Sequence, residues 1–390
     1  MPQGTAVQVG EALALARGLP APETAHDDAA TLCVLYTSGT TGRPKGVVLP
    51  HRGLARLLDR PDFIPLDETD VVAQLCPLNF DGASYEIWGA LAHGAELVVL
   101  DKHLVLSPRE LRTVVRARGI TTLLVTTPLL NRIIEDAPDT LQSLRRVYFG
   151  GELISVRHMR RALRWSRPGV LLHSYGPTEN SFTSTWFPVT DLAPNARTVP
   201  IGRPVPGTEV RVVQEGGTRP VPRGVPGELL LGGVGLADGY LGLPGLTSDR
   251  FVTDGTARLY RTGDRVRWTP EGLLEFIGRD DNQVKIRSQR VELGEVEAVL
   301  DAHPAVESVF VTTRVNGRGE KEIVAYAVAA PARDAGDITR HAKLRLPAFA
   351  VPSHLVLVDA LAPTPTGKID RRRLPDAGPE ARPPATATAP

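Results

Sequence analysis

The sequence is poor in several kinds of residue, and each shortage excludes a class of protein. It has only two cysteines, Cys33 and Cys76, among 390 residues, which excludes a disulfide scaffold and favours a reducing, cytoplasmic compartment. A net charge of +1 argues against a nucleic-acid-binding surface. No apolar run approaches the roughly 18 residues of a membrane-spanning helix, and the first residues lack the basic and apolar blocks of a signal peptide. We therefore expect no nucleic-acid partner and no membrane.

Glycine and proline, in contrast, are plentiful. The 37 glycines and 34 prolines break the chain into short segments without reaching the fraction typical of a disordered protein. Between residues 31 and 188, apolar strand-like runs alternate with helical patterns, which predicts α/β units around a mainly parallel sheet. Residues 197–279 hold short β-like runs separated by Gly and Pro, and they predict a strand-rich subdomain with a hairpin over 268–276.

These patterns divide the chain into four segments. Residues 1–30 form a lead-in with one short helix, at 9–17. Residues 31–280 form a large α/β domain that includes the strand-rich part at about 197–279. Residues 281–375 mix helix and strand and predict a small α+β domain. The tail, residues 376–390, has almost no apolar content beyond alanine and predicts a linker or a frayed end.

The densest group of potential ligand-binding residues lies in YTSGTTGRPKG, residues 36–46. Its glycines let the backbone approach a ligand closely, and its hydroxyls and one lysine suit a polyphosphate. The spacing of a Walker A loop is absent, and an ordinary turn is the alternative. The predicted phosphate-binding residues are Thr37, Ser38, Gly39, Thr40, Thr41, Gly42 and Lys45.

In its setting between strands, this loop resembles the signature of the adenylate-forming superfamily of acyl-CoA synthetases, luciferases and adenylation domains of nonribosomal peptide synthetases. Seven further segments resemble the peptide-synthetase adenylation domains in the same order: FDGASYEIWGAL (80–91), GGE (150–152), YGPTE (175–179), GELLLGGVGLADGYL (227–241), YRTGD (260–264), GRDDNQVKIRSQRVELGEVE (278–297) and PTPTGKIDRRRL (363–374). The resemblance spans residues 28–375. It implies a large adenylate-forming domain that lacks its usual N-terminal part, and a small mobile C-terminal lid domain.

The resemblance also implies a reaction. An α-amino acid carboxylate joins ATP, pyrophosphate leaves, and the aminoacyl group passes to the phosphopantetheine thiol of a carrier protein, in nonribosomal peptide or related biosynthesis. The implied cofactors are ATP and Mg²⁺, and the carrier protein acts in trans or is lost from the sequence. Because several negative charges meet at the α-phosphate, such catalysis needs positioning and cations more than a general base.

By resemblance, Lys368 is the catalytic lysine, Glu179 the Mg²⁺ ligand and Asp281 the hinge. Asp264 would hold the ribose hydroxyls, and Arg279 would contact ribose or phosphate. Without the resemblance, Lys368 reads as a solvated charge, Glu179 as a carboxylate at a helix N-terminus, and the last two as surface salt-bridge partners. The other implied nucleotide contacts are Gly150, Gly151, Glu152, Tyr175, Gly176, Thr178 and Phe276.

The resemblance makes Asp81 the partner of the substrate's α-ammonium, since an ammonium in a pocket needs a counter-charge. A helix N-cap is the alternative role for this residue. The implied side-chain pocket has no second charge, which favours a small or medium neutral side chain that can hydrogen-bond to a Tyr or Ser hydroxyl. Its other residues are Gly82, Tyr85, Val125, Tyr148, Gly150, Ser174, Phe182 and Thr183.

The sequence also departs from the family pattern. The phosphate loop begins 36 residues in, so we expect that the usual front is supplied by a separate chain, was lost by truncation or a misassigned start, or is absent from a compact or degraded variant. Ser288 replaces the usual glycine of a KIRG turn and puts thiolation in question. Two rivals stay open, an acyl- or aryl-CoA ligase, disfavoured by Asp81, and a non-catalytic remnant or half-enzyme, disfavoured by the presence of Lys368, Glu179 and Asp264. A small activating helper protein is a further partner that the resemblance allows.

Overall fold

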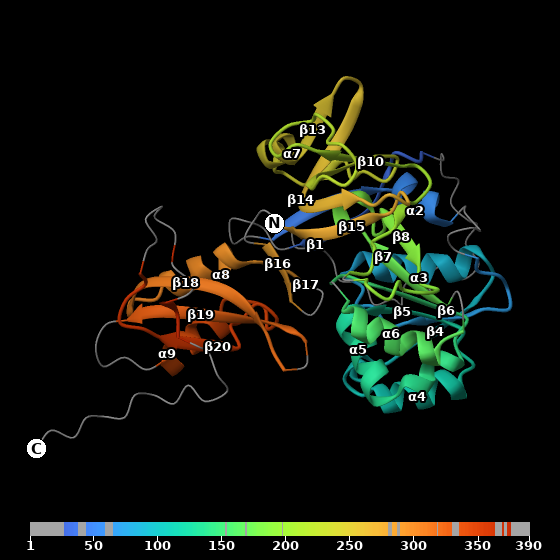
Figure 1. Cartoon of the computed structure of the whole chain (residues 1–390), viewed down its shortest axis with the longest axis horizontal. Helices are drawn as coiled ribbons and strands as arrows, with labels where there is room; N and C mark the ends of the chain where they lie inside the picture. Colours follow the sequence, from blue (N-terminus) through green and yellow to red (C-terminus); the bar gives the residue numbers. More distant parts are fainter. Residues whose placement is uncertain are drawn as a thin grey trace, which may run out of the picture.

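The structure is a computed structural model that describes part of the 390 residues. These are residues 27–37, 44–58, 65–152, 154–167, 170–196, 198–279, 283–286, 289–317, 319–329, 335–362, 369 and 373–375. Several predictions lie outside them, namely the helix at 9–17, the loop residues Ser38, Gly39, Thr40, Thr41 and Gly42, the hinge Asp281, Ser288, the lysine Lys368 and the tail 376–390. Figure 1 shows a larger lobe, made by the chain up to β15, and a smaller lobe that contains β18, β19 and β20.

The larger lobe is organised around a seven-stranded sheet with the order β4-β3-β5-β6-β7-β8-β9. Its first five strands are parallel to one another, and β8 and β9 are antiparallel to their neighbours. The prediction of a mainly parallel sheet is therefore confirmed. The strands are β3 (Val71–Gln74), β4 (Glu96–Val99), β5 (Thr122–Thr126), β6 (Arg146–Gly150), β7 (Leu171–Tyr175), β8 (Thr185–Pro188) and β9 (Arg203–Pro204).

Helices cover both faces of this sheet, and Figure 1 shows α3 on one side and α4, α5 and α6 on the other. Because strand side chains alternate, Leu123 and Phe149 pack under α4, α5 and α6, whereas Leu124 and Tyr148 pack towards α2 and α3. The helices are α2 (His51–Leu58), α3 (Asp81–Ala92), α4 (Pro108–Ala117), α5 (Thr127–Asp136) and α6 (Val156–Trp165), with 3-10 turns η1 (Lys102–Leu106), η2 (Pro138–Gln142) and η3 (Thr178–Asn180).

Two antiparallel sheets complete the larger lobe. One pairs β1 with β2 and β12, so that the strands flanking the phosphate loop lie side by side. The other runs β10-β11-β14-β13 with β15 against β14, and β14 and β15 form the hairpin expected at 268–276. The elements are β1 (Thr31–Thr37), β2 (Lys45–Pro50), β10 (Thr208–Val213), β11 (Gly227–Gly233), β12 (Gly239–Tyr240), α7 (Pro244–Arg250), β13 (Phe251–Asp254), β14 (Ala257–Trp268) and β15 (Leu274–Arg279).

The smaller lobe is α+β, as the sequence predicts. Its sheet has the order β18-β19-β20, and α8 and α9 pack on one apolar cluster with it. A two-stranded hairpin, β16 with β17, precedes this sheet. The elements are β16 (Gln283–Ile286), β17 (Gln289–Glu292), α8 (Leu293–Asp301), β18 (Val306–Val315), β19 (Lys321–Ala329), α9 (Ala335–Lys343) and β20 (His354–Leu357). None of the helices in the described ranges is long and apolar enough to cross a membrane.

Candidate active site

A cavity of about 260 Å³ opens at the carboxyl ends of the parallel strands. This is the edge at which open α/β sheets bind ligands. Register explains three of its wall residues, because Thr126 on β5 pairs with Gly150 on β6, and Gly150 pairs with Ser174 on β7. All three therefore lie on the face that looks towards α3. Gly150 has no room for a side chain, since a Cβ there would lie 2.1 Å from the carbonyl oxygen of Ser174.

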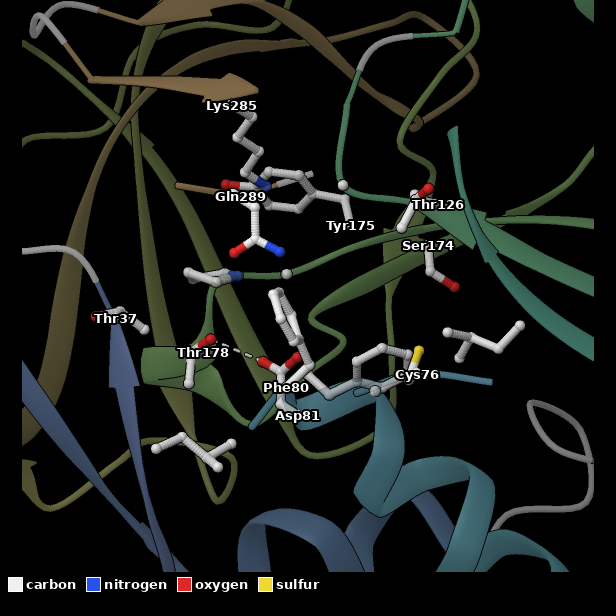
Figure 2. A pocket seen from close by; sticks show the side chains of 18 of the residues that line it. Thr37, Cys76, Phe80, Asp81, Thr126, Ser174, Tyr175, Thr178, Lys285 and Gln289 are labelled. Carbon is white, nitrogen blue, oxygen red and sulfur yellow. Dashed lines mark hydrogen bonds between the residues drawn. The ribbon is translucent and has the colours of Figure 1, made fainter. Parts of the chain in front are cut away.

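Asp81 lies on the opposite wall, at the first residue of α3 (Figure 2). The N-cap of this helix is Phe80, and no side chain caps it. The Thr178 hydroxyl donates a hydrogen bond of 2.8 Å to Oδ2 of Asp81. Burial raises the pKa of Asp81, while the Thr178 hydroxyl and the nearby Lys285 cation act in the opposite direction. The result is a desolvated carboxylate at the cavity wall that a cation would stabilise.

A second carboxylate, Asp264 on β14, lies on another part of the cavity wall. The Tyr175 hydroxyl donates to its Oδ2, and Arg279 forms an ion pair with its Oδ1. The guanidinium of Arg279 also donates to the carbonyl oxygen of Thr262 at 3.0 Å. Burial and the neighbouring Asp264 raise the pKa of Tyr175 well above its usual value, so this phenol stays neutral and acts as a donor. The group combines an aromatic ring, a carboxylate and a cation, which suits a nucleoside with a diol and phosphates.

Lys45 and Glu179 form a buried ion pair next to this cavity. Nζ of Lys45 lies 3.0 Å from Oε1 of Glu179, and the Glu179 side chain is 0% exposed. The hydroxyl of Tyr240 lies 2.9 Å from Nζ of Lys45 and donates to Oε1 of Glu179 at 2.7 Å. The ammonium also lies 4.2 Å from the centre of the Tyr240 ring. Two residues that the sequence predicts as separate ligand contacts thus contact each other.

The inner end of the cavity is apolar. The ring of Phe182 stacks on Tyr85 at 5.3 Å between centroids, and Tyr85 meets Tyr148 edge-on at 5.1 Å. Gly82 leaves space there, because a Cβ on it would lie 3.1 Å from Sγ of Cys76 and 3.3 Å from Cδ2 of Leu124. The buried hydroxyl of Ser174 has no hydrogen-bond partner among the described residues. A ligand that enters this end meets apolar walls and one hydroxyl that lacks a partner.

The smaller lobe also contributes to the wall. Lys285 and Gln289, from the hairpin of β16 and β17, line the cavity, as does Phe349. Figure 2 shows Lys285 and Gln289 across the cavity from Asp81 and Thr178. The resemblance predicts that the 285–295 loop enters the site for thiolation, and the hairpin lies at the cavity in this structure.

The structure brings most of the described site predictions to one cavity. Its wall includes Thr37, Asp81, Gly82, Val125, Tyr148, Gly150, Gly151, Ser174, Tyr175, Gly176, Thr178, Phe182, Asp264 and Arg279. Six other predicted residues are described but do not line it, namely Lys45, Tyr85, Glu152, Glu179, Thr183 and Phe276. Tyr85 lies behind Tyr148 and Phe182. Phe276 packs in the apolar cluster of the strand-rich sheet, 6.5 Å from the Tyr175 ring. The roles of all these residues stay predictions.

Several wall residues were not predicted from the sequence, among them Leu124, Thr126, Cys76 and Phe349. For two of them the signal was present. Val125, which was predicted, packs in the cluster under α4, α5 and α6, whereas Leu124 packs in the cluster with Tyr85 and Tyr148. Period-2 alternation along TLLVT places Leu124 and Thr126 together on the face opposite to Val125. Tyr240, also missed, lies in the GELLLGGVGLADGYL segment that carries the resemblance.

Glu179, the Mg²⁺ ligand that the resemblance implies, is already paired within the protein. No group of three or more potential metal-ligating side chains occurs among the described residues. Oε1 of Glu179 already accepts hydrogen bonds from Lys45 and Tyr240, and this carboxylate does not line the cavity.

The chain matches two protein families in succession. Residues 3–241 match the AMP-binding enzyme family, and residues 295–368 match the AMP-binding enzyme C-terminal domain. It is 45% identical over 349 residues to a linear gramicidin synthase protein of Brevibacillus parabrevis, with 88% of this chain aligned to 7% of that protein. It is 41% identical over 353 residues to surfactin synthase subunit 1 of Bacillus subtilis, with 90% of this chain aligned to 10% of that protein. The chain thus spans a tenth or less of these relatives.

Solved structures agree with the sequence matches. Holo-PA1221, an NRPS protein with adenylation and PCP domains bound to a vinylsulfonamide inhibitor, superposes with a TM-score of 0.79 at 33% identity, over 91% of this chain and 62% of that one. The Vibrio cholerae adenylation domain AlmE, in complex with glycyl-adenosine-5'-phosphate, superposes with a TM-score of 0.78 at 27% identity, over 88% of this chain and 66% of that one. The large and small domains of the expected fold are therefore confirmed.

Proposed function

The chain belongs to the AMP-binding enzyme family, and from this membership we propose that it activates an α-amino acid with ATP, forming an aminoacyl-adenylate and releasing pyrophosphate. The observation that carries the proposal is that Asp81 and the Asp264–Arg279 pair line one cavity. A half-buried carboxylate at one wall suits an ammonium, and the carboxylate and cation at another suit a nucleotide. The similarity to an adenylation domain solved with glycyl-adenosine-5'-phosphate supports a cavity that holds an amino acid at one wall and a nucleotide at another.

The cavity also supports a class of side chain. Its inner end has apolar walls at Leu124 and Phe182, and the buried hydroxyl of Ser174 on the same wall has no hydrogen-bond partner among the described residues. A charged side chain would lack a counter-charge in this end and would be costly to bury. We therefore favour a neutral amino acid of small or medium size with one hydroxyl or amide group. Such a substrate would give Ser174 the partner that it lacks.

In the proposed reaction the protein positions its substrates. Asp81 would bind the α-ammonium and so direct the substrate carboxylate towards the nucleotide. Asp264 and Tyr175 would hold the nucleoside, and the Arg279 cation would offset negative charge near it. Bond formation joins a carboxylate oxygen to the α-phosphorus, and the pyrophosphate oxygen leaves with the bonding electrons. This arrangement needs orientation and charge compensation and no proton acceptor.

The second half-reaction and its partner are also proposals. We propose that a carrier protein brings a phosphopantetheine thiol to this cavity, with the hairpin of β16 and β17 at its wall. The similarity to an NRPS protein that contains both adenylation and PCP domains supports a carrier partner. Mg²⁺ is proposed as the companion of the ATP phosphates, with Lys368 as the catalytic lysine and Asp281 as the hinge. The boundaries at 30, 280 and 375 and the cytoplasmic location stay part of the same proposal.

Amino-acid-dependent exchange of pyrophosphate into ATP tests the proposed function. We expect exchange with one or a few neutral α-amino acids from a panel of twenty, and none with the corresponding acids that lack the amino group. Exchange that depends on fatty or aryl acids instead would favour a CoA ligase. The same panel is run with EDTA, which should abolish exchange if Mg²⁺ accompanies ATP. Absence of both exchange and ATP-analogue binding in the folded protein would contradict the proposal.

A further inference from the structure

A strained turn forms part of the proposed substrate site. After η3 the backbone takes two successive left-handed conformations at non-glycine residues, with φ of 49° at Ser181 and 69° at Phe182. Such values are uncommon for non-glycine residues and are unusual for a bulky aromatic one. The turn places the Phe182 ring on Tyr85 and on the cavity wall. The surroundings must therefore hold this backbone in place.

A buried arginine holds both ends of the turn. Nη2 of Arg56, on α2, donates to the carbonyl oxygen of Asn180 at 2.8 Å and to that of Thr183 at 2.8 Å. It also reaches Oδ1 of Asn180 at 3.2 Å, and Nη1 donates to the Thr208 hydroxyl. The two carbonyl groups lie immediately before and after the strained residues. One guanidinium thus fixes the distance between the ends of the turn.

The slot around this guanidinium requires close approach of the backbone. A Cβ on Gly235 would lie 2.4 Å from Cζ of Arg56, and a Cβ on Gly53 would lie 2.2 Å from Oγ of Ser181. The Ser181 hydroxyl in turn donates to the carbonyl oxygen of Gly235 at 2.8 Å. The glycine positions therefore let α2, the turn and the segment after β11 converge on one cation.

Burial of the Arg56 cation costs free energy, and packing alone does not explain why a charged side chain stands here. Arg56 is only 9% exposed, and among the described residues no carboxylate forms an ion pair with it. Burial lowers the pKa of Arg56 to about 10, so the cation persists at neutral pH with carbonyl and hydroxyl oxygens as its partners. Burying an unpaired cation is unfavourable, and an apolar side chain would fill the space more cheaply. Retention of a five-donor group points to a geometric role.

We propose that Arg56 is a positioning residue that fixes the turn at 180–183 and thereby sets amino-acid selectivity through Phe182. This inference rests on the proposed function, because selectivity presupposes amino-acid binding. Arg56 contacts neither the cavity nor the nucleotide group directly. Its loss should therefore alter amino-acid binding and leave nucleotide binding nearly unchanged.

Kinetics of Arg56→Lys test this role. We expect the KM for the preferred amino acid to rise about tenfold or more, as for the loss of one hydrogen bond to a charged group, and the KM for ATP to stay within about twofold. The relative acceptance of larger neutral amino acids should rise as Phe182 loses its fixed position. Arg52→Lys is the matched control, because Arg52 lies on the same helix in an exposed 2.8 Å pair with Asp238. Equal rises in both KM values, or unchanged selectivity in folded Arg56→Lys, would overturn the proposal.

A double-mutant cycle with Phe182→Leu identifies the route. If Arg56 acts through Phe182, adding Arg56→Lys to Phe182→Leu should change the amino-acid KM by less than about twofold, whereas additive effects would refute that route. If Arg56→Lys does not fold, the same measurements are made on Thr208→Val, which removes one hydrogen-bond acceptor of the Arg56 guanidinium. The amino-acid KM of this variant should rise about threefold.

Hydrogen exchange separates this proposal from the proposed function. Amides of residues 178–184 should exchange about tenfold faster in Arg56→Lys than in the wild type, while amides of β5 and β6 stay unchanged. This measurement needs no substrate. If amide hydrogen exchange is faster but the protein has no amino-acid-dependent activity, the positioning role of Arg56 stands and the proposed function fails. If hydrogen exchange at residues 178–184 is unchanged, the positioning role of Arg56 fails whatever the activity.

Discussion

Replacing Asp81 by asparagine tests the proposed binding mode most directly. The change keeps the shape of the side chain and an oxygen that can accept the hydrogen bond from Thr178. It removes the negative charge that we assign to the substrate ammonium. We expect Asp81→Asn to lose amino-acid-dependent pyrophosphate exchange while its affinity for ATP is retained.

The size of the loss follows from the burial of the pair. Leaving one partner of a buried ion pair uncompensated costs about 3–5 kcal/mol, or about a hundred- to a few-thousand-fold in kcat/KM. The cavity is open to solvent, and Lys285 acts on the same carboxylate, so we take the lower end, about a hundredfold. The exposed Asp238→Asn, which breaks only a surface pair with Arg52, should stay within about twofold.

The same substitution, Asp81→Asn, should lower activity but raise the stability of the folded protein at neutral pH. Burial raises the pKa of Asp81 in the folded protein. As the pH rises from the ordinary aspartate pKa to this raised value, the unfolded chain releases a proton that the folded chain retains, so stability falls. Asp81→Asn lacks this loss. At neutral pH and without substrate it should melt at a higher temperature than the wild type, and the difference should vanish below the ordinary pKa of aspartate.

Discrimination against the acid that lacks the α-amino group provides the decisive readout. The wild type should prefer the amino acid by about a hundredfold or more, and Asp81→Asn should prefer it by only a few-fold. Exchange by Asp81→Asn within about threefold of the wild type, with discrimination intact, would refute the role of Asp81. A parallel loss of ATP binding would indicate that the substitution damages the whole cavity.

Three further predictions concern Glu86, the Lys45–Glu179 pair and Gly150. Burial raises the pKa of Glu86 from 4.5 to about 7, so the unfolding free energy of the wild type should fall by about 3 kcal/mol between those pH values, and denaturant titrations of Glu86→Gln should lack this fall. Lys45→Met leaves the Glu179 carboxylate buried without its ammonium partner, so it should lower the unfolding free energy by about 3–5 kcal/mol. Tyr240→Phe removes only a hydroxyl and should lower it by about 1–3 kcal/mol. Equal effects of the two substitutions would contradict a stabilising ion pair. Gly150→Ala brings a Cβ to 2.1 Å from a backbone oxygen and should prevent folding or sharply lower the melting temperature. Gly245→Ala is the control, because Gly245 lies in α7 with no atom within 4 Å of the added Cβ. It should be neutral or raise the unfolding free energy by up to about 1 kcal/mol.

Local patterns were sufficient to predict the mainly parallel sheet of the large domain. Apolar runs such as TLLVT and RVYFG are short, β-rich and separated by amphipathic helices, so parallel βα units follow from the sequence. The side-chain period of a strand then decides which residues face the cavity. Val125, which the resemblance implies, does line the cavity, and the strand period adds Leu124 and Thr126 on the other face of the same strand.

Pairings between distant segments could not be predicted in this way. Lys45 and Glu179 stand 134 residues apart, and Arg56 and Asn180 stand 124 apart. In the sequence each of these charges reads as an exposed group or as a ligand of its own, because Lys and Arg are mostly exposed in proteins. Their burial depends on how α2 and the β2 strand pack against the segment after β7. Only the three-dimensional structure supplies that information.

The hairpin of β16 and β17 links these distant segments to the chemistry. Lys285 on this hairpin acts electrostatically on Asp81, and it counteracts the burial that raises the pKa of that carboxyl. In the proposed reaction the substrate ammonium would take up the same charge. Two cations then face one carboxylate, so occupancy by an amino acid and the approach of the hairpin are energetically coupled, and each must affect the other equally.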